Sequence, residues 1–351
     1  MRWLLVGLLA FAACACDGEE PAEDAGTDAG PRDTGVAPPD SGPPPLPPCG
    51  NDGAEAAMAC VEQSRYETDL AALAEPRPPG TAHHAAVREL CATRFGELGF
   101  EVELHDYGTG VNVIGTRAGT AAPDERVLLS AHYDSVADCP GADDNATGVA
   151  GLFEAARVLV TAEHERTLVV ACWDEEERGL IGSRAYASRA EMTGEDLRAN
   201  IVYEMIGYRD DAPDSQTIPS GFEVVFPSQV RQIEANERRG DFLAVVGDRG
   251  QSAALADDLV ELGGRVGLPV IPLLLSDSLL SSPATRDLRR SDHSPFWDIG
   301  APGVMITDTS EFRYDRYHCA AGPDAIEGLD PVFATQVVQA SVGAAWRALA
   351  R

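Results

Sequence analysis

The chain has 351 residues and a formal net charge of −30 at pH 7, from 57 acidic residues against 27 lysine and arginine residues. All 27 of these basic residues are arginine. Such an acidic chain excludes nucleic acid as a partner, because binding to a polyphosphate relies on a cationic face. The length allows one large domain or two average ones.

Residues 1–16 have the pattern of an export signal. Arg2 is followed by an apolar stretch, 4–13, which is far shorter than the ~20 residues of a membrane-spanning helix. Small residues precede Cys14 and Cys16, as at the processing site of a bacterial lipoprotein, with either cysteine as the lipid-bearing residue. We therefore expect an exported protein, anchored in the cell envelope by a lipid or secreted, with no other association with a membrane.

Residues 17–48 carry eight acids, one arginine and many prolines. This composition cannot bury a core and predicts a disordered, partly extended acidic linker. Residues 49–351 alternate between strand and helix patterns without a comparable interruption, which indicates one large domain.

Six cysteines remain in the exported part, and disulfides are permitted outside the cytoplasm. Cys49 and Cys60 flank the start of the domain and are the first candidate pair. Cys91 and Cys172 lie in apolar helix and strand patterns, so we expect buried thiols at both positions.

The first part of the domain is predicted to contain two helices followed by two neighbouring strands. The helices are expected at 62–73 and 84–98, and the strands at 101–106 and 111–117.

The next segment, 127–148, reads VLLSAHYDSVADCPGADDNATG and combines a strand, an acidic turn and a helix start. The apolar strand leads to His132 and Asp134, which share one strand face. Asp144 lies just before the helix. An imidazole is a good zinc ligand, a carboxylate can bridge two cations, and a second carboxylate can fix the imidazole tautomer. Open α/β sheets place their sites at such positions. Taken alone, the same residues also fit a surface pair and a solvated turn.

Two further strands end near carboxylates. The apolar strand 167–173 is followed by four acids at 174–177, which are costly at a strand end unless cations or water neutralise them. A solvated helix start would also explain this run. The strand 200–206 contains Glu204 within an apolar run, and buried carboxylates in such runs are usually paired or bound to a metal.

The second half is predicted to begin with loops and a short strand at 208–240, covering the site. Strands at 241–246, 268–275 and 303–307 and helices at 252–263 and 331–349 complete the pattern. Surface positions without a functional role are expected for four histidines: His83, His84, His105 and His164.

Six ordered motifs, AHYDS, GADDNATG, DEEERGLIGS, YEMIGY, SDHSPF and RYH, resemble those of the zinc-dependent exopeptidase family of the bacterial di-zinc aminopeptidases. That family also contains glutamate carboxypeptidase II and the glutaminyl cyclases. The resemblance covers about residues 60–345. It implies a three-layer α/β/α sandwich around a central mixed, mostly parallel sheet, and two zinc ions per chain.

The resemblance also implies the ligands of both ions. One ion would be bound by His132, Asp144 and Glu204, and the other by Asp144, Glu177 and His318, each with an open position for water.

The remaining site residues take roles around these ligands by the same resemblance. Asp134 would orient His132, and Glu176 would act as the general base that deprotonates the metal-bridging water. Tyr317 would donate to the oxyanion. Asp292 and His293 match a segment that lines the site.

Two departures from the family pattern stand out. Glu204 occupies a position where the best-known di-zinc aminopeptidases have Asp, and the acid usually found a few residues after His318 is missing. Cys139 lies a few residues before the expected ligand Asp144, and Cys319 directly follows the expected ligand His318. If those ligands share one cluster, these cysteines can pair, and the bridge would replace the missing acid as a support for His318.

These observations predict an exported di-zinc metallopeptidase that removes N-terminal residues from peptides, with peptides as its partners. One alternative is a glutaminyl-cyclase-like acyltransferase with one zinc ion. A second is a non-catalytic binding ectodomain on the same fold, against which the complete ligand set and Glu176 argue.

Overall fold

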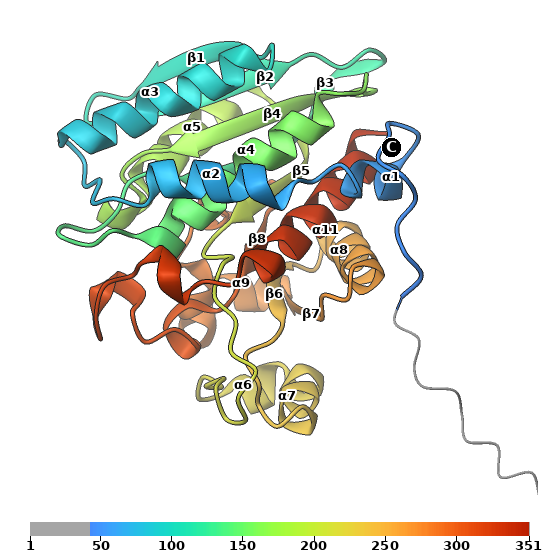
Figure 1. Cartoon of the computed structure of the whole chain (residues 1–351). Coiled ribbons are helices and arrows are strands. Elements are labelled where there is room, and N and C mark those ends of the chain that lie inside the picture. The colour runs from blue at the N-terminus through green and yellow to red at the C-terminus, as the bar shows by residue number, and fades with distance from the viewer. Residues whose placement is uncertain (1–42, 351) are drawn as a thin grey trace, which may run out of the picture. The chain divides into compact units, whose positions relative to one another are not determined.

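An eight-stranded sheet in the order β1-β2-β4-β3-β5-β8-β6-β7 forms the centre of the computed structural model (Figure 1). The structure describes residues 43–350, so the expected export signal and most of the expected linker lie outside the described residues. Four of the seven strand pairings are parallel. The strands are β1 (Glu101–Asp106), β2 (Val111–Arg117), β3 (Ala122–His132), β4 (Arg166–Trp173), β5 (Asp196–Tyr203), β6 (Leu243–Asp248), β7 (Val270–Leu275) and β8 (Val304–Thr307).

Helices cover both faces of the sheet. In chain order they are α1 (Ala54–Met58), α2 (Gln63–Leu73), α3 (Ala82–Glu97), α4 (Gly148–Leu159), α5 (Ile181–Thr193), α6 (Phe222–Val225), α7 (Pro227–Ala235), α8 (Ala253–Arg265), α9 (Asp277–Leu280), α10 (Ser294–Asp298) and α11 (Pro331–Leu349).

The two faces have separate apolar cores because strand side chains alternate between them. Leu243 and Val245 of β6 belong to the large core beneath α1 to α4, α8 and α11. Ala244 and Val246 point to the opposite face, where they pack with Phe226 at the start of α7. Under α5 and α10 the same face is filled by Trp173 of β4, Tyr186 of α5 and Phe296 of α10, together with aliphatic residues of the sheet and of α5. The expected three-layer α/β/α sandwich with a mixed sheet is confirmed.

The four central strands run in the same direction. β3 pairs in parallel with β4 and β5, and β5 pairs in parallel with β8. Their carboxyl ends therefore lie at one edge of the sheet, where binding sites of open α/β sheets form.

Two predicted elements differ from the structure. β5 ends at Tyr203, so Glu204 follows the strand instead of interrupting it. The segment 208–240 contains α6 and α7, where loops and a short strand were expected; its one strand-like feature among the described residues is an isolated bridge between Asp210 and Gly240. Pro227 at the first position of α7 favours a helix start, since its missing N–H has no partner there in any case.

Two disulfides join the expected cysteine pairs. Cys49 is bonded to Cys60, and Cys139 to Cys319. Cys91 and Cys172 are buried free thiols, as predicted. Within residues 43–350 no helix has the length and apolar character needed to cross a membrane.

Packing also changes the expected boundary of the linker and the expected surface positions of two histidines. Leu46, inside the expected linker, packs against the large core. The expected surface position was wrong for His84 and His164, which are 5% and 8% exposed. Each ring has a partner that replaces water: His84 Nε2 lies 2.7 Å from Asp174 Oδ1, and His164 Nε2 lies 2.8 Å from the Leu159 carbonyl.

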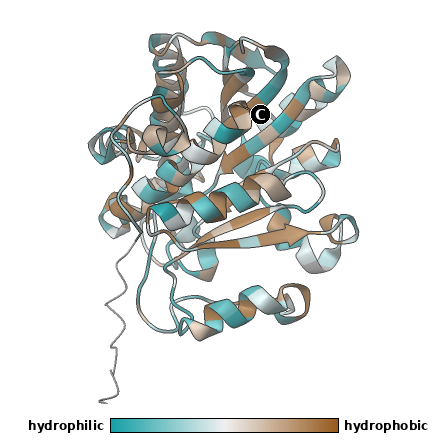
Figure 2. Cartoon of the chain, turned by 90° about the vertical axis from the view of Figure 1, so that its right-hand side faces the viewer, coloured by the Kyte–Doolittle hydropathy of each residue, from teal (hydrophilic) through white to brown (hydrophobic). Residues whose placement is uncertain are grey.

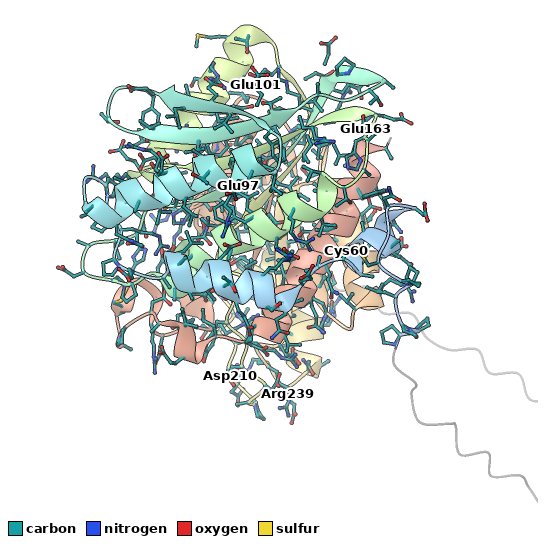
Figure 3. All side chains as sticks on the ribbon, turned by 45° about the horizontal axis from the view of Figure 1, so that its top comes forward. Cys60, Glu97, Glu101, Glu163, Asp210 and Arg239 are labelled. Carbon is teal, nitrogen blue, oxygen red and sulfur yellow. A yellow bond between two sulfur atoms is a disulfide. The ribbon has the colours of Figure 1, made fainter. Side chains whose placement is uncertain are left out.

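Exposed acidic side chains lie on the surface of the domain. Figure 3 labels Glu97, Glu101 and Glu163, all of which are exposed. The negative charge of the composition is therefore present on the folded surface.

Candidate metal centre

Strand ends and one long loop bring the candidate ligands together. His132 is the last residue of β3, Glu176 and Glu177 follow β4, and Glu204 follows β5. His318 lies on the chain between β8 and α11. Because β3, β4 and β5 are mutually parallel, these side chains converge at the same edge of the sheet.

Asp144 reaches this edge through the turn that precedes α4. Gly141 has a φ of 58°, and a Cβ atom there would lie 2.3 Å from the Asp144 carbonyl oxygen, so the turn requires glycine. Asn145 joins the turn to the end of β5: its Nδ2 donates to the Tyr203 carbonyl at 2.8 Å and its Oδ1 accepts from Met205 N at 3.1 Å. These bonds hold Asp144 beside Glu204.

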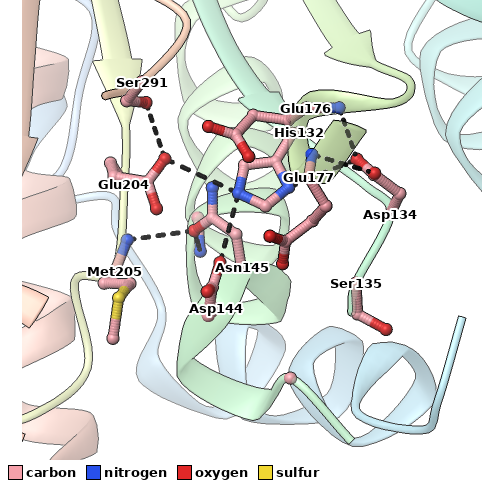
Figure 4. Close-up of polar contacts among 12 residues, drawn as sticks. His132, Asp134, Ser135, Asp144, Asn145, Glu176, Glu177, Glu204, Met205 and Ser291 are labelled. Carbon is pink, nitrogen blue, oxygen red and sulfur yellow. Dashed lines mark hydrogen bonds and ion pairs between the residues drawn. The ribbon is translucent and has the colours of Figure 1, made fainter. Parts of the chain in front are cut away.

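One group of ligand atoms surrounds His132 (Figure 4). Its Nε2 lies 3.3 Å from Asp144 Oδ1 and 3.5 Å from Glu204 Oε2. Ser291 Oγ donates to Glu204 Oε2 at 2.6 Å and fixes that carboxylate. Glu176 also faces this group, since a carboxylate oxygen of Glu176 lies within 4.8 Å of ligand atoms of His132 and Glu204.

A second group surrounds His318. Its Nε2 lies 3.2 Å from Asp144 Oδ2 and 3.1 Å from Glu177 Oε2. Asp144 therefore presents one oxygen to each histidine, which is the arrangement of a carboxylate that bridges two cations.

The spacing of these atoms fits zinc. Nitrogen and oxygen ligands lie ~2.0–2.2 Å from a tetrahedral zinc ion, which places them roughly 3.3 Å from one another. The four separations within the two groups are 3.1 to 3.5 Å. His132 Nε2 and Glu177 Oε1 are buried without a hydrogen-bond partner among the described residues. Buried polar atoms without partners are rare, and a bound cation would satisfy these two.

The electrostatics of the cluster also favour cations. Burial, opposed by His132, raises the pKa of Glu176 well above its ordinary value, and the carboxylates of Glu204 and Asp292 add to this rise. Burial and Asp144 raise the pKa of Glu177 to about 7. Buried acids with raised pKa values show that negative charge is unfavourable here without a counter-charge.

Asp134 supports both histidine and acids. Its Oδ1 lies 3.4 Å from His132 Nδ1, on the side of the ring away from the ligand atoms. The same carboxylate accepts backbone hydrogen bonds from Glu176 N at 3.0 Å and Glu177 N at 3.2 Å. Asp134 therefore lies where it could orient the imidazole, and it fixes the turn that carries both glutamates.

The four consecutive acids divide into two functional pairs. Asp174 is bonded to His84 and accepts from Val111 N at 3.0 Å, and so anchors the turn to β2. Glu175 accepts from Thr109 Oγ1 at 2.6 Å and from Arg178 at 2.9 Å. These two acids are held by protein partners, whereas Glu176 and Glu177 face the candidate metal centre.

Arg77 supports the site, although no motif of the sequence indicates it. It is 0% exposed, and among residues 43–350 it has no carboxylate partner within hydrogen-bonding distance. Its guanidinium donates to backbone carbonyls of Tyr133 at 2.9 Å, Pro140 at 2.6 Å and Gly141 at 2.8 Å. Arg77 thereby joins the segments that carry Asp134 and Asp144. No periodicity or motif spacing distinguishes such an arginine from a surface one.

Tyr317 lies over His318, with the two rings stacked and their centroids 3.8 Å apart. Arg290 Nη2 donates to the Tyr317 hydroxyl at 3.1 Å. Burial, followed by the negative charge of Asp144, raises the pKa of Tyr317, which keeps the hydroxyl protonated and able to donate. Tyr317 lines the same cavity as Asp144, Glu176 and Glu204.

Asp292 and His293 have different environments. Asp292 is 0% exposed, and both of its carboxylate oxygens lack a hydrogen-bond partner in the described part of the chain. Burial raises its pKa to about 7, although the charge of His132 opposes this rise. His293 was expected to line the site, but its Nε2 lies 2.9 Å from the Leu288 carbonyl and its ring packs edge-on against Trp297. The structure thus gives His293 a packing role.

Two features connect the loop of His318 to the turn of Asp144. The disulfide between Cys139 and Cys319 joins the chain before the turn to the residue after His318. Asp324, six residues beyond His318, accepts from Asp143 N at 3.0 Å and from Asp144 N at 3.0 Å. An acid is therefore present in this loop, but its contacts are with the Asp144 turn.

The fold and this cluster define a class of α/β protein with two adjacent groups of metal ligands at the carboxyl edge of a mixed sheet. Residues 112–340 match the model of peptidase family M28, and the chain belongs to that family. The prediction of a zinc-dependent peptidase is confirmed at the level of the family.

Curated relatives agree with this assignment. The chain is 32% identical over 206 residues to the uncharacterized protein YfbL of Escherichia coli, covering 55% of this chain and 58% of that protein. It is 28% identical over 293 residues to a probable zinc metalloprotease of Pyricularia oryzae, covering 74% of this chain and 56% of that protein. The matches thus span little more than half the length of these relatives.

Solved structures show the same fold at low identity. The LapA aminopeptidase of Legionella pneumophila has a TM-score of 0.65 at 17% identity, with 84% of this chain and 74% of that chain covered. The glutaminyl cyclase of Porphyromonas gingivalis has a TM-score of 0.55 at 19% identity, with 83% and 98% covered.

Proposed function

We propose that this protein is a di-zinc aminopeptidase that hydrolyses the first peptide bond of peptides with a free N-terminus. The observation that carries the proposal is the position of Asp144, whose two oxygens lie 3.3 Å from His132 Nε2 and 3.2 Å from His318 Nε2. One carboxylate is thereby shared between two groups of ligands. The names of family relatives, including a leucine aminopeptidase 1 of Sclerotinia sclerotiorum, support cleavage from the N-terminal end of peptides.

The residues of this chain would divide the chemistry as follows. Zinc, when bound by His132, Asp144 and Glu204 and by Asp144, Glu177 and His318, supplies a Lewis acid that polarises the peptide carbonyl and lowers the pKa of water. Glu176 accepts the proton of the attacking water and passes it to the leaving amine, because its carboxylate lies within 4.8 Å of ligand atoms of His132 and Glu204 without being one of the proposed ligands. Tyr317 donates a hydrogen bond to the oxygen on which negative charge develops.

The glutaminyl-cyclase-like alternative uses the same scaffold with one zinc ion. The structural similarity to a glutaminyl cyclase is the observation that favours this alternative. Against it stands the second ligand group, in which Glu177 Oε2 lies 3.1 Å from His318 Nε2. The longer side chain of Glu204, compared with Asp, still brings its carboxylate within 3.5 Å of His132.

Elemental analysis of the purified protein, combined with mass spectrometry of peptide products, tests the proposal. We expect two zinc ions per chain and stepwise release of N-terminal residues, with no cleavage of peptides whose amine is acetylated. Glu204→Ala should lose one ion selectively, because Asp144, Glu177 and His318 remain for the other. One ion in the wild type, with loss of ammonia from peptides that begin with Gln, would replace the aminopeptidase assignment by the cyclase. A protein that binds zinc and transforms neither peptide would support the binding ectodomain.

A further inference from the structure

The turn 174–177 carries the proposed base Glu176 on a backbone that needs support. Glu175, directly before Glu176, has a φ of 56°, in the left-handed region that residues other than glycine rarely adopt. Such a conformation persists only where the surrounding structure imposes it. The contacts that hold this turn therefore determine where the carboxylate of Glu176 lies.

The carboxylate of Asp174 receives three hydrogen bonds at the start of this turn. It accepts from Glu175 N at 2.9 Å and from Val111 N of β2 at 3.0 Å. The third partner is His84 Nε2, 2.7 Å from Asp174 Oδ1. Burial opposes ionisation, but the bonds from His84 and Val111 N hold the pKa of Asp174 below its ordinary value. Because an ionised carboxylate can only accept hydrogen bonds, His84 Nε2 is the donor.

His84 lies on the buried face of α3, which packs against β1, β2 and β4 (Figure 1). The buried residues of this helix follow the spacing of one helical face and are His84, Val87, Cys91 and Phe95. Figure 2 shows that the helices of the domain carry hydrophilic as well as hydrophobic residues, as expected where one face of each is buried. His84 is thus a polar residue within an apolar stripe, and burial of its ring is costly without the bond to Asp174.

The carboxylate of Asp174 has no easy substitute for this donor. Asp174 is 1% exposed, so bulk water does not reach it. The chain also passes close to it, since a Cβ atom at Gly110 would lie 2.7 Å from Asp174 Oδ2. A buried carboxylate that loses a donor carries the full cost of its desolvation. Without His84 we therefore expect the carboxylate, and the turn that follows it, to move.

We propose that His84 is a positioning residue for the reaction: its hydrogen bond to Asp174 holds the turn of Glu175 in the conformation that directs the carboxylate of Glu176 at the metal centre. This inference rests on the proposed aminopeptidase function. The described residues that line the cavity at the metal centre include Glu176 but not His84, so His84 acts through Asp174 and the turn. Its loss should lower kcat and leave KM nearly unchanged, because the residues that face the substrate are retained.

Substitutions that separate the donor from the ring test this inference. His84→Phe removes the donor but keeps a ring beside Tyr133, whose centroid lies 4.9 Å from that of His84. His84→Gln loses the ring but keeps an N–H donor the same number of bonds from Cα. With a free-amine tripeptide such as Leu-Ala-Ala, we expect kcat to fall roughly 10–100-fold in His84→Phe and to stay within about threefold of the wild type in His84→Gln, since a small displacement of a catalytic group has effects of this size.

His164 is the matched control. It is also a buried histidine, its Nε2 lies 2.8 Å from the Leu159 carbonyl, and its ring packs edge-on against Trp346. His164→Phe should leave kcat unchanged even where its melting temperature falls. Zinc content and melting temperature are measured for every variant, and His84→Leu repeats the test should His84→Phe not fold.

The outcomes separate this inference from the proposed function. An unchanged kcat in well-folded His84→Phe would overturn the inference alone. Equal losses in His84→Phe and His84→Gln would also overturn it, because the ring would then matter and not the donor. Loss of zinc together with activity would do the same, since the turn would then be holding the ligand Glu177 and not the base. A wild-type enzyme that cleaves no free-amine peptide would overturn the proposed function, and this inference with it.

Discussion

At the scale of single residues, the site depends on side chains with two roles at once. Asp134 orients His132 and also accepts the backbone N–H groups of Glu176 and Glu177. Asp144 faces both histidines. Replacing the proposed ligand Glu177 should lower the zinc content, whereas replacing the proposed base Glu176 should lower the rate of hydrolysis and leave the zinc content unchanged. The two effects are separable although the two glutamates are adjacent in the sequence.

Glu176→Gln should abolish peptide hydrolysis while the zinc content stays that of the wild type, because the substitution removes a base and no proposed ligand. A general base contributes ~10²–10⁴-fold to the rate, and one that activates the nucleophile should reach the upper end of this range. Steady-state kinetics and elemental analysis on the same preparation provide the measurement. Glu177→Ala should lose metal, and Glu163→Gln, at an exposed position, serves as the control. Activity of Glu176→Gln within a few-fold of the wild type would remove Glu176 from the mechanism.

At the scale of elements, the ligands are positioned by three parallel strand ends and one long loop. The strand ends are fixed by the sheet, but the loop of His318 lies outside it. The disulfide between Cys139 and Cys319 closes a sequence separation of 180 residues and fixes this loop next to the turn of Asp144.

Replacing both Cys139 and Cys319 by Ala should lower the free energy of unfolding by about 2–5 kcal/mol, since loss of a native disulfide typically costs this amount. Zinc affinity at the group of Glu177 and His318 should fall as well. Urea unfolding and competition with a chromophoric chelator measure the two effects. The double replacement of Cys49 and Cys60 is the matched control, because that disulfide closes a separation of 11 residues away from the cluster and should leave zinc affinity unchanged. Unaltered zinc affinity in the first variant would show that the loop of His318 is held by other contacts.

At the scale of the whole molecule, the net charge of −30 and the acidic cluster make bound cations part of the stability. In the metal-free protein, burial first and neighbouring carboxylates second raise the pKa of Glu177 to about 7. Burial likewise raises the pKa of Asp292 to about 7. A folded-state pKa above the unfolded value means that the folded protein binds more protons, so stability is lost as the pH rises through that value.

Chelation should therefore lower the melting temperature more at pH 8 than at pH 5. At pH 8 we expect a decrease of about 5–15 °C, since a ligand present at a thousand times its Kd stabilises by ~4 kcal/mol. At pH 5, below these two pKa values, Glu177 and Asp292 of the metal-free protein are mostly protonated and repel their neighbours less, while zinc binds less tightly because protons compete for its ligands. Calorimetry with and without a chelator at both pH values checks this, and added zinc should restore the melting temperature. An equal decrease at both pH values would contradict the expectation that protonation of Glu177 and Asp292 stabilises the metal-free protein.

Export remains a proposal at this scale. The two disulfides support it, because stable disulfides are typical of oxidising compartments. A lipid on Cys14 or Cys16 would hold the enzyme at the cell envelope at the end of the acidic linker, and the peptides it meets there would be extracytoplasmic.

The sequence by itself predicted most of the helices and strands and the residues proposed as metal ligands. Apolar runs of strand length and the 3.6-residue periodicity of helices are local properties, and β1, β2 and α11 have the predicted bounds. His132, Asp144, Glu177, Glu204 and His318 were assigned as ligands by the resemblance of six ordered motifs to those of the zinc-dependent exopeptidase family.

Only the tertiary structure decided which residues support the site. Arg77 and His84 look like surface residues in sequence, and they are buried because partners far along the chain, the carbonyls of Pro140 and Gly141 and the carboxylate of Asp174, replace water. The cavity beside the candidate metal centre is lined by residues of α6 and α7 together with residues of β6 and β7, whose contacts no local pattern encodes. Burial, hydrogen-bond partners and cavities depend on which distant segments pack together, and that is settled when the whole sheet and its helices assemble.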